Sequence, residues 1–278
     1  MTVVNTGRRY DDATHARLAA DAAQVLGRYP DTRSALLPLL HLVQSEDGFV
    51  SPSGIAFCAE TLDLSTAQVS AVATFYTQYK RRPNGEYTVG VCTNTLCGIM
   101  GGDAIWEDLT ERLGIGNDET TADGKITLER IECNAACDYA PVMMINWEFF
   151  DNQTPESAAD VVGRLIAGEP VAPSRGPDRV GTFKEVSRVL AGFNDGHANE
   201  GVAAGAPTLR GLELARAQGW SAPAYPEGDS DSGAAPLDAG DTTPGVGEPQ
   251  SSTDRPAAGA QERSGEQEKT EHGSEKES

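Results

Sequence analysis

Four of the five cysteines in this 278-residue chain lie in two closely spaced pairs. Cys92 and Cys97 form the first pair, in CTNTLC, and Cys133 and Cys137 form the second, in CNAAC. No apolar signal core follows the first residues, so we expect a cytosolic protein whose thiols are kept reduced. Four such thiolates can hold one zinc ion, or a [2Fe–2S] cluster that takes two thiolates on each iron.

The spacing of the pairs favours the cluster over the other uses of cysteine. Zinc knuckles prefer C-x2-C, and plant-type ferredoxins group three cysteines together, whereas 35 residues separate these two pairs. The thioredoxin dithiol motif C-x-x-C is absent, which disfavours thiol–disulfide exchange. Spacing alone therefore favours an iron–sulfur cluster. A zinc site, unrelated buried thiols and redox-active thiols remain as alternatives.

Other residues that could do chemistry have simpler explanations. Cys58 shares an apolar helical stripe with Ile55 and Leu62, which predicts packing in a core. His41 lies on a predicted helix without a second ligand at suitable spacing, so we expect it at the surface or at a cap. The glycines of GIMGG lack the Lys-Ser/Thr of a phosphate loop, and we expect them to allow close approach of the backbone to the cysteine site.

The elements that must position the cysteines change in type near residue 83. Helical periodicity and caps dominate residues 1–82, whereas alternation in 87–91 predicts a strand. A helix, a second strand, a cysteine loop, a strand with an edge hairpin and a last helix follow. The fold class predicted is α/β (α+β), with a helical domain before a small sheet, and both cysteine pairs fall at strand ends.

Composition limits the partners and divides the rest of the chain. The net charge of −20 argues against nucleic acid as a partner, and no apolar run is long enough for direct membrane insertion. Residues 226–278 contain 13 Asp/Glu and 4 Lys/Arg, a net charge of −9, and no aromatic residue, which predicts an acidic disordered tail. We expect four parts: a helical domain (1–82), a sheet domain (83–169), an extension that binds a partner (170–225) and the tail.

Two long stretches carry a resemblance to a known family. VGVCTNTLCGIMGGDAIWEDLTERLGI and TTADGKITLERIECNAACDYAPVMMIN resemble the thioredoxin-like [2Fe–2S] ferredoxin family, and within it the 24-kilodalton-type (E) subunits of NADH:quinone oxidoreductase, complex I. The resemblance implies a thioredoxin-like sheet and one [2Fe–2S] cluster held by Cys92, Cys97, Cys133 and Cys137.

The same resemblance implies a function as an electron-transfer subunit without a catalytic site of its own. The cluster would exchange electrons with an FMN on the neighbouring NADH-oxidising subunit, and NADH would also bind there. Other peripheral-arm subunits would be partners, at the inner face of the cell membrane. The equivalent subunit of an NAD-dependent formate dehydrogenase or NAD-reducing hydrogenase is an alternative, and a structural zinc scaffold is another.

Two features modify these expectations. Many members of the family carry Leu-Gly between the last two cysteines, where this chain has Asn134 and Ala135. We expect the lost glycine to change backbone freedom and amide hydrogen bonds to sulfur. The negative net charge disfavours adding an electron, which predicts a cluster of low reduction potential.

Overall fold

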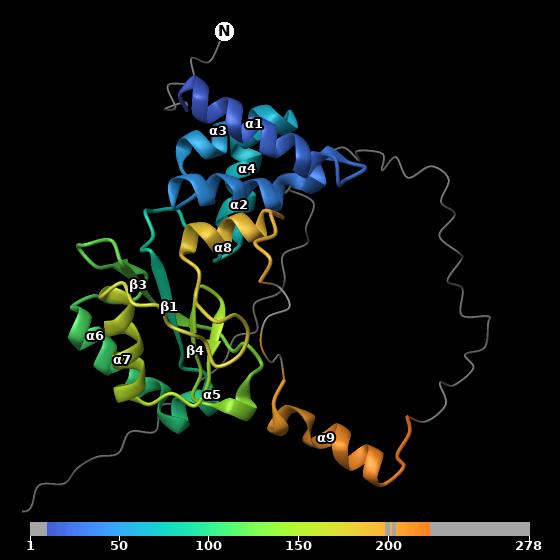
Figure 1. Cartoon of the computed structure of the whole chain (residues 1–278). Coiled ribbons are helices and arrows are strands. Elements are labelled where there is room, and N and C mark those ends of the chain that lie inside the picture. The colour runs from blue at the N-terminus through green and yellow to red at the C-terminus, as the bar shows by residue number, and fades with distance from the viewer. Residues whose placement is uncertain (1–9, 198–200, 202–203, 223–278) are drawn as a thin grey trace, which may run out of the picture. The chain divides into compact units, whose positions relative to one another are not determined.

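The computed structural model describes residues 10–197, 201 and 204–222 (Figure 1). The segment 226–278, predicted to be a disordered tail, lies outside these residues. The described residues up to Ser221 belong to one compact unit. Within the described part, every helix is too short or too polar to cross a membrane.

Helices make up the first part of the described chain. They are α1 (Asp12–Leu26), α2 (Leu36–Asp47), α3 (Pro52–Leu62) and α4 (Thr66–Phe75). Two of them begin with side-chain caps: Ser51 accepts a hydrogen bond from the Gly54 amide, and Ser65 forms a capping box with Gln68. Their apolar faces meet in one core, and Cys58 lies fully buried in it. The prediction that Cys58 packs in a core is confirmed.

The prediction that His41 lies at the surface or at a cap is wrong. Its side chain is only 5% exposed, and its ring lies 4.8 Å from the ring of Tyr79. Burial lowers the pKa of His41 to about 4, so the imidazole is neutral at pH 7. The physical reason is that α2 is buried on most of its circumference: α1, α3 and the later helix α8 (Phe183–Leu190) pack against it, and Tyr79 lies against the His41 ring.

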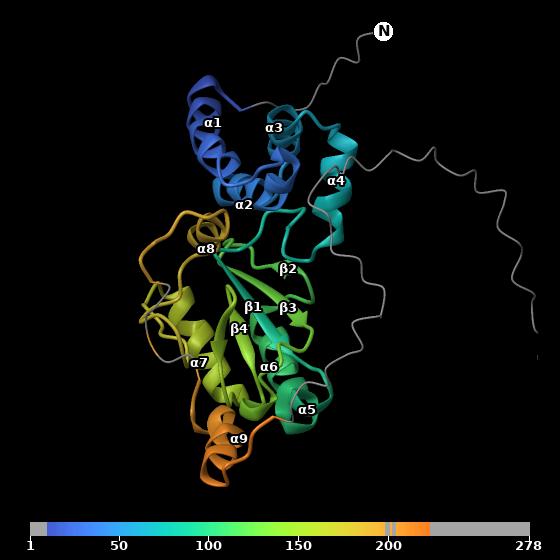
Figure 2. The same ribbon diagram turned by 90° about the vertical axis from the view of Figure 1, so that its right-hand side faces the viewer.

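A five-stranded sheet forms the second part. Its strands are β1 (Tyr87–Cys92), β2 (Glu119–Thr120), β3 (Ile126–Ile131), β4 (Met143–Ile145) and β5 (Glu148–Phe150). They lie in the order β2-β3-β1-β4-β5, with β1 parallel to β3 and antiparallel to β4. Helices α6 (Asp103–Leu113) and α7 (Pro155–Ile166) pack against the sheet, and their apolar faces share a core with Val89 and Val91 of β1 (Figure 2). The predicted mixture of helices and a thioredoxin-like sheet is confirmed.

The segment after α7 contains two further helices. The first is α8, whose Phe183 and Ser187 are buried. The second is α9 (Ala206–Ala217), where Leu212 is 47% exposed although it is apolar. Binding of a partner by residues 170–225, like the four domain boundaries, stays a prediction.

Candidate metal centre

The parallel pairing of β1 with β3 brings the two cysteine loops to one edge of the sheet. Cys92 is the last residue of β1, and its register partner is Ile131, two residues before Cys133. Parallel strands run in the same direction, so the loops that follow them leave from the same edge. The first loop continues into the short helix α5 (Thr95–Cys97), which carries Cys97.

The four cysteines of the two pairs line one small pocket. Its walls consist of the following residues: Cys92, Cys97, Cys133, Asn134, Ala136, Cys137 and Val142. The Sγ atoms of Cys133 and Cys137 lie 3.6 Å apart. Cys92 and Cys97 are each 3% exposed, whereas Cys133 and Cys137 are exposed. The structure therefore brings together the four thiols that the sequence singles out, and leaves Cys58 in the separate helical core.

The thiols affect each other's ionisation. The pKa of Cys92 is raised to about 11, chiefly by burial; the neighbouring Cys97 and Cys133 also raise it, and a hydrogen bond from the Asn94 backbone amide opposes the rise. The pKa of Cys137 is also raised, chiefly by its hydrogen bond with Cys133 and by the charge of that thiol. Four thiolates this close repel one another, so their joint ionisation requires a cation among them. A bound metal supplies that charge.

The donor set fits an iron–sulfur cluster. Four sulfur donors with no competing carboxylate or imidazole line the pocket, and they stand as two pairs, one from each loop. Across the described residues, no group of three or more His, Cys, Asp or Glu, the four thiols included, is arranged as it stands to hold a metal ion. A [2Fe–2S] cluster takes two thiolates on each iron, which matches the pairing.

Glycines allow the backbone to pass close to the buried pair. Gly98–Gly102 forms a π-helical turn between α5 and α6, and Gly101 has a φ of 122°. A Cβ on Gly102 would lie 2.4 Å from the Cys92 carbonyl oxygen and 2.8 Å from that of Cys97. The turn thus packs against the backbone of both buried cysteines and leaves no room for a side chain at Gly102, while close approach of these glycines to a cluster stays a prediction.

The exposed pair is held by a loop that turns at Ala135. Its φ of 55° lies in the left-handed region, which costs a residue with a Cβ about 1 kcal/mol or more. The Ala135 amide donates a hydrogen bond to Cys133 Sγ at 3.4 Å. The alanine thus occupies a backbone conformation that a glycine would adopt freely.

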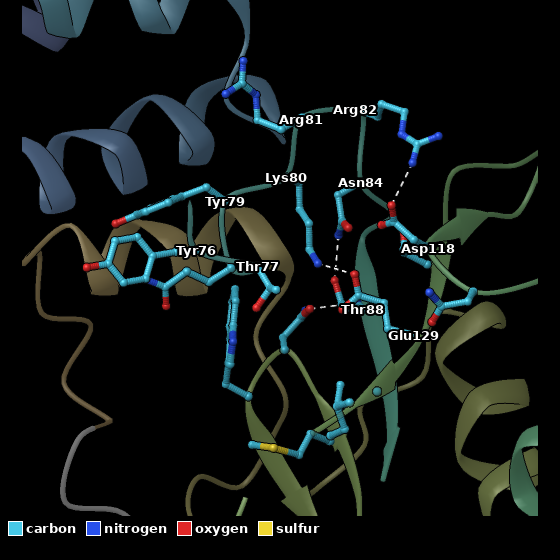
Figure 3. Close-up of a pocket in the computed structure, with 18 of the residues that line it drawn as sticks. Tyr76, Thr77, Tyr79, Lys80, Arg81, Arg82, Asn84, Thr88, Asp118 and Glu129 are labelled. Atoms are coloured by element: carbon cyan, nitrogen blue, oxygen red, sulfur yellow. Dashed lines mark hydrogen bonds and ion pairs between the residues drawn. The ribbon is translucent and has the colours of Figure 1, made fainter. Parts of the chain in front are cut away.

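A second hollow, which the sequence did not reveal, adjoins the cysteine pocket. Figure 3 shows this groove between residues 73–84 and one face of strands β1 and β3. Lys80 and Glu129 form an ion pair in it, and Arg82 pairs with Asp118 at 2.8 Å. Asn134 lines both the groove and the cysteine pocket. No sequence pattern signals the groove, because its walls come from segments that lie far apart along the chain.

The fold and this donor set define the class of protein. A family model, thioredoxin-like [2Fe-2S] ferredoxin, matches residues 22–165, and the chain belongs to that family. The E subunit of NADH-quinone oxidoreductase from Mycobacterium tuberculosis (strain ATCC 25618 / H37Rv) is 60% identical over 230 residues, covering 82% of this chain and 91% of that protein. The protein of the same name from Rickettsia bellii (strain RML369-C) is 38% identical over 147 residues, covering 52% of this chain and 88% of the relative.

Among solved structures, a NAD+-reducing [NiFe]-hydrogenase in the air-oxidized state is similar over 49% of this chain and 23% of that chain. The TM-score is 0.45 and the identity 21%. This likeness is too distant to bear on function.

Proposed function

We propose that the chain is the iron–sulfur electron-transfer subunit of an NADH:quinone oxidoreductase, with Cys92, Cys97, Cys133 and Cys137 as ligands of one [2Fe–2S] cluster. The observation that carries the proposal is the single pocket lined by these four thiols at the ends of two parallel strands. Family membership and the names of the relatives support it. When bound, the cluster supplies a site that accepts and releases one electron.

The chain's own residues position and shield the sulfurs. Cys92 and Cys97 are each only 3% exposed, so water has little access to that side of the pocket. The Asn94 and Ala135 amides donate to sulfur, which favours the negatively charged form. Cys133 and Cys137 are exposed, and a partner's redox group therefore approaches from their side.

The partners and the location follow from the same proposal. The electron partner is an FMN on the NADH-oxidising subunit, which also binds NADH, and other peripheral-arm subunits complete the assembly. Within it the chain lies at the inner face of the cell membrane. Affinity purification from native membranes, with identification of the associated proteins, tests this assignment. Recovery of a hydrogenase or formate dehydrogenase without a quinone-reducing complex would contradict it.

Cluster content provides the direct test of the four ligands. Anaerobically purified protein should be brown and contain about two irons per chain, as expected for one [2Fe–2S] cluster. Cys133→Ser should lose the visible absorbance. Cys58→Ala should keep it, because its thiol lies in the helical core. Colourless wild-type protein with one zinc, or equal loss of colour in both variants, would contradict the assignment.

A further inference from the structure

The two thiol pairs differ in access as well as in sequence. Cys133 and Cys137 are exposed, whereas Cys92 and Cys97 are each 3% exposed. Thiol–disulfide exchange requires a thiolate that can reach the attacking or attacked sulfur, so burial makes a thiol unreactive. A disulfide reagent from solution therefore reaches only one pair without opening of the fold.

Cys133 and Cys137 also lie close enough to form a disulfide with each other. The Sγ atoms of Cys133 and Cys137 are 3.6 Å apart, and an S–S bond is about 2 Å long, so they need to approach by only about 1.5 Å. The loop between them turns at Ala135, whose φ of 55° is left-handed, and both cysteines line the same pocket. Both side chains are exposed, which leaves them room to rotate.

We propose that Cys133 and Cys137 form a reversible intramolecular disulfide whenever the chain carries no cluster and meets a low-molecular-weight disulfide such as oxidised glutathione. The thiolate of one cysteine attacks a glutathione sulfur, forming a mixed disulfide and releasing one glutathione. The second thiolate then attacks the protein sulfur of that mixed disulfide and releases the second glutathione. The chain loses two electrons and two protons, and oxidised glutathione becomes two glutathione molecules.

This disulfide would decide whether a cluster can bind. A sulfur in a disulfide cannot act as a thiolate ligand, so the oxidised chain keeps only the buried half of the site. Reduction restores the exposed half. This consequence for the cluster rests on the proposed function, whereas the disulfide itself does not.

Trypsin separates the cysteines conveniently for a test. Cleavage after Lys and Arg, but not before Pro83, leaves Cys133 and Cys137 together on residues 131–164 and Cys92 and Cys97 on 82–112. Cys58 falls on 34–80. The full-length chain is stripped of iron with a chelator, reduced, and exposed to oxidised glutathione. Free thiols are then blocked with a maleimide under denaturing conditions before digestion and mass spectrometry.

The cysteines of the 131–164 peptide should form a disulfide at least about tenfold faster than those of the 82–112 peptide. The disulfide is detected as a mass loss of two hydrogens and as the absence of added maleimide. Equal oxidation of both peptides, or a lasting glutathione adduct on 131–164, would overturn the proposal. Cys137→Ser should trap glutathione on Cys133, and Cys97→Ser should leave the disulfide intact. The peptide map of the wild-type chain tests the proposal by itself, so the result does not depend on whether either variant folds.

Iron uptake separates this proposal from the assignment of the site. The reduced chain should rebuild its visible absorbance with iron and sulfide. The oxidised chain should bind about tenfold less iron until dithiothreitol is added. If the reduced chain never binds a cluster, the proposed function fails while the peptide map still stands. If oxidised and reduced chains take up iron equally, the disulfide does not control cluster binding.

Discussion

Cys92 and Cys97, at the two ends of the first loop, are buried beside a glycine-rich turn, whereas Cys133 and Cys137 are exposed and their loop turns at an alanine. The first loop is fixed between β1 and α6, two elements of the sheet core. The second depends on the later part of the chain. Arg175 lies over the ring of Tyr139, with its guanidinium carbon 5.1 Å from the ring centroid, and Thr208 donates to Asp138.

This difference shows how one site can combine rigidity with access. The buried pair is held in place before anything binds, because the surrounding core already determines its backbone. The exposed pair lies where a partner, an iron donor or an oxidant can reach it. Rigid support on one side and access on the other suit a centre that must be assembled and must then exchange electrons.

Among these substitutions, Gly102→Ala should lower the free energy of unfolding the most. Its Cβ would lie within 3 Å of the carbonyl oxygens of Cys92 and Cys97, so the backbone around the buried pair must shift. We expect a loss of about 3 kcal/mol in the free energy of unfolding, at the upper end for overpacking. Urea denaturation measures it. Gly163→Ala, inside α7 and with open space around its Cβ among the described residues, should instead stabilise the chain by about 0.5 kcal/mol.

Thiol reactivity tests the burial difference directly. In the native, iron-free chain, iodoacetamide should modify Cys133 and Cys137 about 100-fold faster than Cys92 and Cys97, because the buried pair reacts only through local opening. Peptide mapping after timed quenching gives both rates in one sample. Cys58, 0% exposed in the helical core, serves as an internal control for a fully buried thiol. Similar rates for the two pairs would show that the first loop opens readily.

Much of this architecture was predictable because periodicity and cysteine spacing are local signals. The strand at Tyr87–Cys92 follows from alternation, and the caps at Ser51 and Ser65 follow from side-chain chemistry. The unequal burial of the two pairs was not predictable, since C-x4-C and C-x3-C look alike in sequence. It depends on the π-helical turn at 98–102, which forms only because glycines accept its close contacts.

Features that depend on distant contacts also escaped prediction. His41 is buried beside Tyr79, on a helix that also packs against α8, and no local pattern reports these distant contacts. Lys80 and Glu129, which pair in the groove beside the site, are 49 residues apart. Only the folded chain brings such residues together.

Asn94→Ala tests a direct link between the two loops. The Asn94 side chain donates to a Glu132 carboxylate oxygen at 3.1 Å, and its Oδ1 lies 3.8 Å from Cys92 Sγ. Loss of this exposed bridge should cost about 1 kcal/mol of unfolding free energy, as for an ordinary hydrogen bond. Asn94→Asp keeps the acceptor but removes the donor, and it should lose at least as much because it faces the Glu132 carboxylate. An unchanged free energy in both variants would mean that the loops are positioned independently.

Ala135→Gly should have the smallest effect, and its sign is the informative part. Glycine removes the cost of about 1 kcal/mol that a Cβ carries at a φ of 55°, but it adds unfolded-state entropy worth about 0.5 kcal/mol. The net expectation is a stabilisation of about 0.5 kcal/mol, measured by urea denaturation. Ala159→Gly, in the middle of α7, should destabilise by about 1 kcal/mol, as glycine normally does in a helix. Opposite signs for these two substitutions would confirm that the exposed loop stores backbone strain at Ala135. Equal losses would instead show that the loop relaxes around the alanine, and the contrast with the glycine-built loop would then rest on burial alone.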